Sequence, residues 1–425
     1  MKRYDAYKST GIPWIPEVPE HWEMRKLRHF IEMISEKNHP QEPLLSVVRD
    51  QGVILRDITS KEENHNAIPD DLSGYKLIEK GHFAINKMKA WQGSYGVSSY
   101  RGIVSPAYYT CRLNFEHKAY FNLAIRSDAY VPFFTQYSKG IRVGQWDLSP
   151  IGLKEIPFFL PPLSEQRAIV AYIERKERQI DTYIARQAEQ IERLKELRQT
   201  IISHAVTRGI HPYTRFRPTG IPWIPEVPEH WEMRKLRHFI EIISEKNHPQ
   251  EPLLSVVRDQ GVILRDITSK EENHNAIPDD LSGYKLIEKG HFAINKMKAW
   301  QGSYGVSSYR GIVSPAYYTC RLNFEHKAYF NLAIRSDAYV PFFTQYSKGI
   351  RVGQWDLSPI GLKEIPFFLP PLSEQHAIVA YIEKKTTAVD RMINACREQT
   401  ELMKAYKQRL ISDAVTGHIN VLPHD

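Results

Sequence analysis

Three short stretches of the sequence, residues 49–56, 87–95 and 139–146, combine basic and amide side chains with glycine, and the last two also contain aromatic side chains. Guanidinium and ammonium groups can hold phosphates or read guanine, and the amide of glutamine can read adenine. These residue types make and break hydrogen bonds and ion pairs without making covalent bonds. The chemistry that they predict is reversible binding to a nucleic acid, with a subset of the three stretches contacting bases.

No sequence pattern for catalysis accompanies these stretches. The Asn-Pro-Pro-aromatic and Asp-Pro-Pro-aromatic tetrapeptides of DNA methyltransferases are absent, as are HExxH, CxxC and phosphate-binding lysine motifs. Glu-x-Lys, the spacing of some nucleases, occurs at residues 174–176 and 383–385. Both sites fall on long predicted helices, where charged residues are expected to face solvent. We therefore predict no catalytic residue and no metal site in this chain.

The sequence contains an internal repeat of a whole globular unit. Residues 11–166 recur as residues 220–375, an offset of 220 − 11 = 209, and the one difference is Met33 against Ile242. Such a period is far too long for a solenoid and indicates a tandem duplication. Every candidate site therefore occurs twice. The candidate DNA-binding residues are Arg49, Gln51, Arg56, Lys87, Lys89, Trp91, Gln92, Tyr95, Lys139, Arg142, Gln145 and Trp146, with Arg258, Gln260, Arg265, Lys296, Lys298, Trp300, Gln301, Tyr304, Lys348, Arg351, Gln354 and Trp355 in the second copy.

Each copy leads into a stretch with the apolar spacing of a coiled coil. The two stretches, residues 163–206 and 372–415, follow proline stops, and Ser164 can cap the first of them. A single heptad seam cannot be buried alone, so each helix needs a partner, and the other helix is the obvious one. The predicted seam residues are Ile173, Ile180, Ile184, Ile191, Leu194, Ile201, Ile382, Val389, Ile393, Cys396, Met403 and Leu410.

Composition limits the class of protein. With 425 residues the chain is too long for one core. Its net charge of +8 makes a polyanionic partner plausible. The three cysteines fit neither a disulfide framework nor a metal site, which favours a reducing cytoplasm. No signal peptide or membrane-spanning apolar run is found in the sequence, so we expect a cytoplasmic protein without membrane contact.

The elements that position the candidate residues predict a mixed α+β domain in each copy. The prolines of residues 10–27 favour an extended opening segment, with Trp14 and Trp22 as packing anchors. Residues 44–58 read as a hairpin around Asp50-Gln51-Gly52, and residues 119–131 read as a helix that Pro132 interrupts. We expect domain 1 at residues 1–160, helix 1 at 161–208, domain 2 at 209–369, and helix 2 with a tail at 370–425.

Four motifs in this order resemble the specificity subunit of type I restriction–modification systems. They are STGIPWIPEVPEHW, INKMKAWQGSYGVSSYRGIVSPAYY, the repeated IPFFLPPLSEQ, and the ending LISDAVTGHINV. The resemblance covers essentially the whole chain. It implies two target-recognition domains separated by two conserved spacer helices that form an antiparallel coiled coil with pseudo-twofold symmetry.

The resemblance also implies partners. A subunit of this kind does no chemistry; it binds double-stranded DNA and places two modification subunits, which carry S-adenosylmethionine and methylate adenine. Restriction subunits that use ATP and Mg²⁺ join the same assembly, so we expect no cofactor in this chain. The recognition domains of the family generally differ, whereas here they are almost identical. We therefore expect two identical inverted half-sites, an interrupted palindrome.

Two alternatives remain open at this level. One is the DNA-specificity part of a fused restriction–methylation system, in which catalysis lies in another polypeptide or domain. The other is a scaffold that binds two copies of a protein and no DNA. A steep fall of duplex affinity with salt separates DNA binding from the scaffold, because neutralising phosphates releases counterions.

Overall fold

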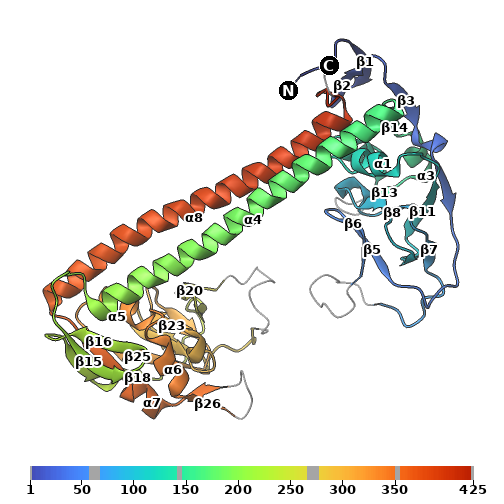
Figure 1. The fold of residues 1–425 in the computed structure, drawn as a ribbon. Helices are drawn as coiled ribbons and strands as arrows, with labels where there is room; N and C mark the ends of the chain where they lie inside the picture. Colours follow the sequence, from blue (N-terminus) through green and yellow to red (C-terminus); the bar gives the residue numbers. More distant parts are fainter. Residues whose placement is uncertain (1, 57–67, 141–145, 266–276, 350–354, 423–425) are drawn as a thin grey trace. The chain divides into compact units, whose positions relative to one another are not determined.

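The computed structural model describes residues 2–56, 68–140, 146–265, 277–349 and 355–422. The chain forms two compact units (Figure 1). Unit 1 comprises Met1–Gln187 and Arg397–Asp425, and unit 2 comprises Ala188–Cys396. Each unit holds one strand-rich domain and about half of each long helix. The expected α+β class, with two strand-rich domains and two long helices, is confirmed.

The strand-rich domain of unit 1 is built from short elements. They are β1 (Tyr7–Ile12), β2 (Ile15–Pro19), β3 (Glu23–Lys26), η1 (Leu27–His29), β4 (Ile31–Ile34), β5 (Leu45–Val48), β6 (Gly52–Leu55), β7 (Lys76–Ile78), β8 (Phe83–Asn86), η2 (Ala90–Gln92), β9 (Tyr95–Val97), β10 (Gly102–Val104), β11 (Tyr108–Leu113), α1 (Lys118–Ile125), α2 (Val131–Gln136), β12 (Ser138–Lys139), β13 (Asp147–Leu148), α3 (Pro150–Glu155) and β14 (Pro157–Leu160). The helix α4 (Leu163–Arg208) follows and continues into unit 2.

Unit 2 repeats the same order of elements, as its sequence requires. They are β15 (Phe216–Ile221), β16 (Ile224–Pro228), β17 (Glu232–Lys235), η3 (Leu236–His238), β18 (Ile240–Ile243), β19 (Leu254–Val257), β20 (Gly261–Leu264), β21 (Lys285–Ile287), β22 (Phe292–Asn295), η4 (Ala299–Gln301), β23 (Tyr304–Val306), β24 (Gly311–Val313), β25 (Tyr317–Leu322), α5 (Lys327–Ile334), α6 (Val340–Gln345), β26 (Ser347–Lys348), β27 (Asp356–Leu357), α7 (Pro359–Glu364) and β28 (Pro366–Leu369). The helix α8 (Leu372–Val415) then returns to unit 1.

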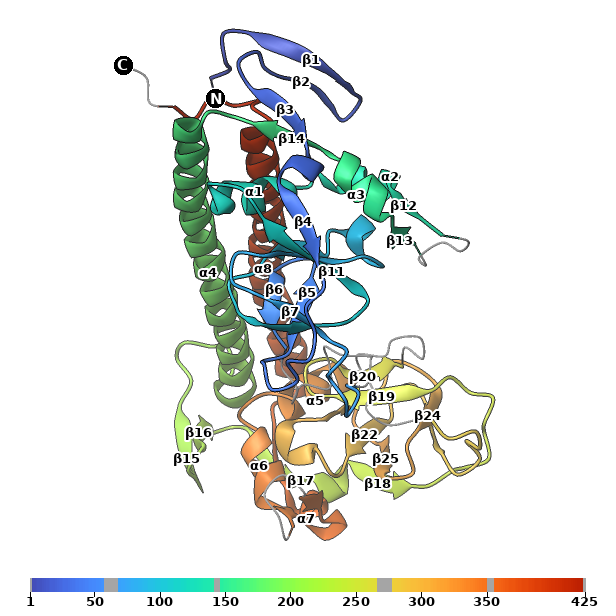
Figure 2. The ribbon, with the colours of Figure 1, turned by 90° about the vertical axis from the view of Figure 1, so that its right-hand side faces the viewer.

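A four-stranded antiparallel sheet organises each strand-rich domain. Its order in unit 1 is β4-β11-β8-β9, and β4 and β11 are seen side by side in Figure 2. Phe83 of β8 contacts Phe121 of α1, and Phe121 stacks on Phe158 of β14, with ring centroids 5.4 and 5.0 Å apart. This aromatic core anchors β8 at its first residue, and one of the candidate stretches follows the last residue of that strand.

The two long helices pair antiparallel within each unit. In unit 1 the Tyr183 hydroxyl donates to Gln399 at 2.8 Å, and Lys407 contacts Asp181 at 3.1 Å, so the start of α4 lies against the end of α8. In unit 2 Arg198 contacts Asp390 at 3.1 Å, which places the end of α4 against the start of α8. The predicted pairing of the two helices is confirmed. Because α4 begins at Leu163, Ser164 lies inside its first turn rather than at its cap.

The seam residues differ in how fully they are buried. Seven of them are buried: Ile173, Ile180, Ile382, Val389, Ile393, Cys396 and Leu410. Five are half-buried: Ile184, Ile191, Leu194, Ile201 and Met403. Near the end of α4, Ile202 is buried in place of Ile201. Along a straight helix, the residues of a seven-residue repeat rotate away from the seam by about 20° per heptad. Over the four heptads from Ile173 to Ile201 this rotation approaches the ~100° between neighbouring residues, so Ile202 takes the buried position.

The predicted helix of residues 119–131 is wrong in its extent. α1 ends at Ile125, residues 126–130 break the helical run, and Pro132 lies in the first turn of a second helix, α2. Proline is well tolerated in a first turn because the N–H that it lacks would have no helical acceptor there. Pro132 therefore helps to start a helix where the sequence pattern suggested an end.

A buried carboxylate anchors the opening segment of unit 1. Glu165, in the first turn of α4, accepts hydrogen bonds from the indole of Trp22 at 3.0 Å and from the Tyr4 hydroxyl, and its other oxygen pairs with His21 at 2.8 Å. Burial, followed by the neighbouring Glu165 carboxylate, raises the pKa of Tyr4 well above its ordinary value. Trp22 is fully buried, which confirms it as a packing anchor, and Trp14 packs its edge on Phe133.

The chain termini meet beside this anchor. The Asn420 amide donates to the Lys2 carbonyl at 2.9 Å, and the Tyr7 hydroxyl accepts from the Tyr4 amide and donates to the Gly417 carbonyl at 2.9 Å. Two ends of the chain thus complete the same part of unit 1.

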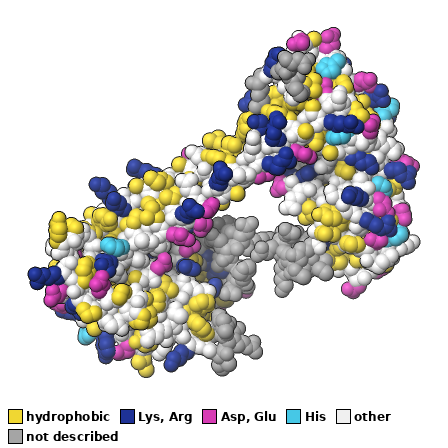
Figure 3. Space-filling model, viewed as in Figure 1, with side chains coloured by type: hydrophobic (Ala, Val, Ile, Leu, Met, Phe, Trp, Pro, Cys, Tyr) yellow, Lys and Arg dark blue, Asp and Glu magenta, His cyan; other side chains and the backbone are white. Residues whose placement is uncertain are grey.

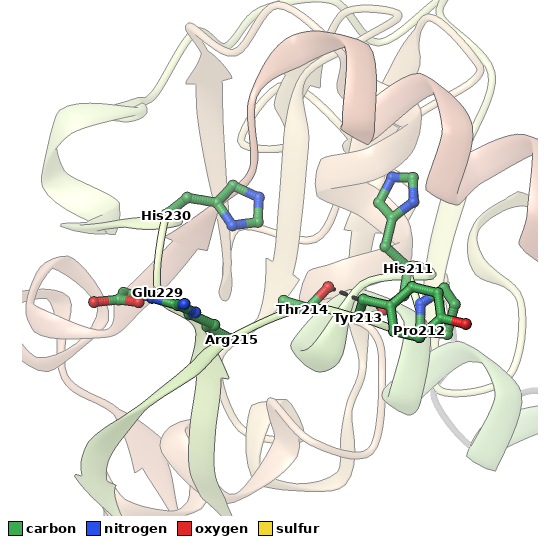
Figure 4. A pocket seen from close by; sticks show the side chains of 7 residues that line it. All are labelled: His211, Pro212, Tyr213, Thr214, Arg215, Glu229 and His230. Atoms are coloured by element: carbon green, nitrogen blue, oxygen red, sulfur yellow. Dashed lines mark hydrogen bonds between the residues drawn. The ribbon is translucent and has the colours of Figure 1, made fainter.

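The equivalent part of unit 2 is a continuous linker, and its anchor is less complete. Glu374 pairs with His230 and accepts from the indole of Trp231, as Glu165 does in unit 1. Tyr213, at the repeat position of Tyr4, is 96% exposed, against 9% for Tyr4. An open hollow of about 600 Å³ is lined by linker residues 211–215 and by Glu229 and His230. Figure 4 shows His230 on one side of this hollow and Tyr213 on the other. The second copy therefore leaves open the place that an aromatic ring fills in the first.

We predict that Tyr4→Phe lowers the stability of unit 1, since it removes a donor to a buried charge. A hydrogen bond to a charged group is worth about 1.5–3 kcal/mol, and urea unfolding followed by intrinsic tryptophan fluorescence would measure the loss. Tyr213→Phe is the matched control and is expected to change stability by less than about 0.5 kcal/mol, as at most exposed positions. Equal effects of the two variants would contradict the contrast between the anchors.

Candidate nucleic-acid interface

The first candidate stretch forms a hairpin, as predicted. β5 and β6 pair antiparallel from Leu45 with Leu55 to Val48 with Gly52. Gly52 has a φ of +74°, a left-handed conformation that glycine adopts without strain. Arg49 and Gln51 are exposed on the turn. Arg56 lies beyond β6 and is half-buried, so the turn itself presents the first two side chains.

The second stretch is a tight turn between β8 and β9. Lys89 and Gln92 are exposed on it, and the indole of Trp91 donates to the Met88 carbonyl at 3.2 Å. Gly93 follows η2 with a φ of +91°, which lets the chain reverse into β9. These contacts hold the basic and aromatic side chains of the turn in a defined order.

The third stretch packs against the second. Lys87 pairs with Asp147 at 2.9 Å, and the Leu148 amide donates to the Lys87 carbonyl at 3.0 Å. The rings of Trp91 and Trp146 lie 5.2 Å apart. The hydrogen bond to Asp147 raises the pKa of Lys87, which therefore stays charged. Lys139, on β12, is exposed and lies opposite Asp147 in the strand register.

The hairpin lies on the other side of the same turn. A Cβ atom on Gly93 would be 3.6 Å from Cγ of Arg49, so the two turns are in contact. The structure therefore brings the described residues of the three candidate stretches, which are up to 146 − 49 = 97 residues apart in the sequence, to one edge of the domain. Arg142 and Gln145 lie outside the described residues.

Tyr95 is a correction to the predicted site. Its side chain is 0% exposed and stacks on Phe134, with ring centroids 3.8 Å apart. Tyr304 stacks on Phe343 in the same way at 3.9 Å and is equally buried. The prediction that these two tyrosines contact DNA is wrong, because a core side chain cannot reach a base. The aromatic character of the stretch at this position serves packing.

Three cations of this edge are available to a ligand. Arg49, Lys89 and Lys139 make no ion pair with any residue that the structure describes, in contrast to Lys87. Over the face drawn in Figure 3, basic and acidic side chains are interspersed. Within this edge, Lys87 is thus neutralised by an ion pair, whereas these three cations have none with a described residue. Met88, missed from sequence, is also exposed here, between the two lysines.

Unit 2 presents the same arrangement. Lys296 pairs with Asp356 at 2.9 Å, the Trp300 and Trp355 rings lie 5.2 Å apart, and Gly302 lies against Arg258. The remaining second-copy candidates occupy equivalent places: Gln260, Lys298 and Lys348 are exposed, and Arg265 and Gln301 are half-buried. Arg351 and Gln354 lie outside the described residues.

Other kinds of site are not seen in the part of the chain that the structure describes. No group of three or more His, Cys, Asp or Glu side chains there could hold a metal ion. No described helix is long and apolar enough to cross a bilayer. The three cysteines all lie in described segments and are buried, and no disulfide joins them. Burial raises the pKa of the Cys111 thiol to about 12.

Comparison with known proteins finds similarity over nearly the whole chain. A protein of Methanocaldococcus jannaschii, assigned as the putative specificity subunit of the type I restriction enzyme MjaX, is 23% identical over 98% of this chain and 97% of its own length. This chain is therefore similar over nearly its whole length to a putative type I restriction specificity subunit. No family model matches it.

Solved structures agree at the level of the fold. A chain from a structure of a type I restriction–modification system, described in terms of complex assembly and conformational transition, superposes with a TM-score of 0.60. It is 17% identical and is covered over 99% of its length and 95% of this chain. The fold of that chain thus extends over nearly the whole of this one. The HsdS subunit from Thermoanaerobacter tengcongensis has a TM-score of 0.46 and 17% identity over 95% of this chain and 98% of its own.

We predict that Tyr95→Phe combined with Tyr304→Phe stabilises the protein by about 1 kcal/mol, because each hydroxyl is buried without a described acceptor. Thermal unfolding of the double variant would measure the change. Tyr108→Phe is the control, since its hydroxyl accepts from Asn86, and it is expected to destabilise. A loss of DNA affinity in the double variant at unchanged stability would restore the tyrosines as contacts.

Proposed function

We propose that this chain is the DNA-recognition subunit of a type I restriction–modification complex and acts on double-stranded DNA in the cytoplasm. The observation that carries the proposal is the edge on each strand-rich domain where three separate stretches converge and present cations without acidic partners. The homology to type I specificity subunits supports the same function. No catalytic step is assigned to this chain.

Base readout is proposed for the exposed side chains of this edge. Arg49 on the hairpin turn can donate two hydrogen bonds to guanine. Gln51 can pair with adenine, since its NH2 group donates to N7 and its carbonyl oxygen accepts from the N6 amino group. Lys89 and Lys139 supply the positive charge that phosphates require. Arg142 belongs to the same proposal from its place in the sequence.

Modification and restriction subunits are the proposed partners. In this proposal the modification subunits hold S-adenosylmethionine and carry out adenine methylation, and restriction subunits supply the reaction with ATP and Mg²⁺. The two long helices, which run through both units, would set the spacer between the half-sites.

The site should be an interrupted palindrome, because the described residues of the two edges are the same. Selection from random duplex DNA with the full chain, alone and with its partner subunits, is expected to return one short half-site in two inverted copies. Affinity should fall steeply between about 50 and 200 mM salt, as phosphate contacts require.

Lys89→Ala with Lys298→Ala provides the matched test of the edge. It should weaken binding to all sequences and reduce the slope of log affinity against log salt by roughly one for each phosphate that a lysine neutralises in the wild-type complex. Lys8→Ala, on β1, is the control and should leave the slope unchanged. Two unrelated half-sites would contradict the symmetric readout. If the chain binds a protein partner with an affinity that does not depend on salt and binds no DNA, the scaffold alternative would be favoured.

Two modification subunits should bind one copy of this chain, since each unit offers an equivalent surface. Native mass spectrometry of the purified complex would measure the ratio. A saturated one-to-one complex would show that the two units are not equivalent toward this partner.

A further inference from the structure

Arg126, which is not among the candidate DNA-binding residues, is hydrogen-bonded to the hairpin turn of the candidate edge. It follows the last turn of α1, and its Nη2 donates to the carbonyl oxygens of Arg49 and Asp50 at 3.0 and 2.8 Å. Both acceptors belong to the turn of the β5–β6 hairpin. A single guanidinium nitrogen thus ties the hairpin turn to a helix about 75 residues further along the chain.

Two glycines make room for this guanidinium. A Cβ atom on Gly52 would lie 3.3 Å from Cζ of Arg126, and one on Gly96 would lie 3.2 Å from the Gly52 backbone and 3.3 Å from Cδ of Arg126. Gly96 is on β9, next to the turn that carries Lys89 and Gln92. The arginine is therefore packed against the two backbone turns that form the candidate edge.

The surroundings of Arg126 are those of a fixed group. Burial lowers its pKa, and its Nε–H is buried without an acceptor among the described residues. The neighbouring Asn122 accepts from the Val97 amide at 2.9 Å and so joins α1 to β9 as well. A partly desolvated cation that donates to turn carbonyls holds those carbonyls in place. If the turn moved away, the buried guanidinium would lose its hydrogen-bond acceptors, which is energetically costly.

We propose that Arg126 is a positioning residue for base readout: it fixes the β5–β6 turn so that Arg49 and Gln51 meet the DNA in one orientation. Arg335 does the same in unit 2, where its Nη2 donates to the carbonyls of Arg258 and Asp259 at 2.9 and 2.8 Å. The inference rests on the proposed function. The side chain acts through the turn and need not contact a base.

The two copies allow each variant to carry its own control. Arg126→Met keeps the length and apolar stem of the side chain and removes the donors. In selection from random duplex DNA, it should lose about tenfold of the discrimination at one half-site, as one mismatched base pair does, and leave the other half-site strict. Arg335→Met should give the same asymmetric site, and the double variant should relax both halves. Arg126→Lys, which keeps one donor group, should restore part of the discrimination.

A second measurement does not depend on DNA. Amide hydrogen exchange at residues 49–53 of the full chain should speed up by about tenfold or more in Arg126→Met, because the turn then opens without breaking its bonds to a buried charge. Residues 258–262 should stay unchanged. Arg112→Met is the control, because Arg112 pairs with Glu32 on the surface of the sheet and should not alter these amides.

The positioning role of Arg126 and the proposed DNA recognition can fail separately in these experiments. Unchanged exchange at residues 49–53, or equal relaxation of both half-sites by Arg126→Met, would overturn the positioning role. Faster exchange in a protein that shows no sequence-selective DNA binding would instead overturn the proposed function and keep the structural link between Arg126 and the turn.

Discussion

Burial of the ends of both long helices against the strand-rich domains is the constraint on which this structure depends. In unit 1, Ile173 of α4 and Leu410 of α8 belong to one buried cluster with Phe158. In unit 2, Ile202 of α4 and Ile382 of α8 join the cluster of Phe367. The two helices therefore contribute side chains to both hydrophobic cores and also pack against each other. Removing apolar surface from water thus couples helix pairing to domain stability in each unit.

Local sequence signals predict the parts whose cause is local. The Asp50-Gln51-Gly52 turn follows from glycine at a left-handed position, and the heptad seam follows from spacing along one helix. The burial of Tyr95 could not be read in this way, since it depends on Phe134 of α2, which lies 134 − 95 = 39 residues later. Likewise, no motif marks Arg126, whose partners at Arg49 and Asp50 are set by tertiary packing.

Chain continuity introduces differences that near-identical sequences do not. In unit 1 the opening segment lies beside residues 417–420, and Tyr4 donates to the Glu165 carboxylate. The same position in unit 2 is reached from α4 through Gly209, whose φ is +73°. Phe216, the counterpart of Tyr7, lacks the hydroxyl that bridges the two chain ends of unit 1. Outside the diverged long helices, the two units therefore differ mainly in the segment that leads into each strand-rich domain.

The near-identity of the copies has a cost during folding. β4 pairs with β11, where Glu32 and Arg112 are 80 residues apart, yet β25 offers the same sequence at Arg321, a separation of 321 − 32 = 289. Loop-closure entropy favours the nearer partner by only about 1 kcal/mol. Strand exchange between copies is therefore weakly opposed by the strands themselves. The long helices differ in sequence between the two copies. Their pairing can therefore favour the correct strand pairings over the exchanged ones.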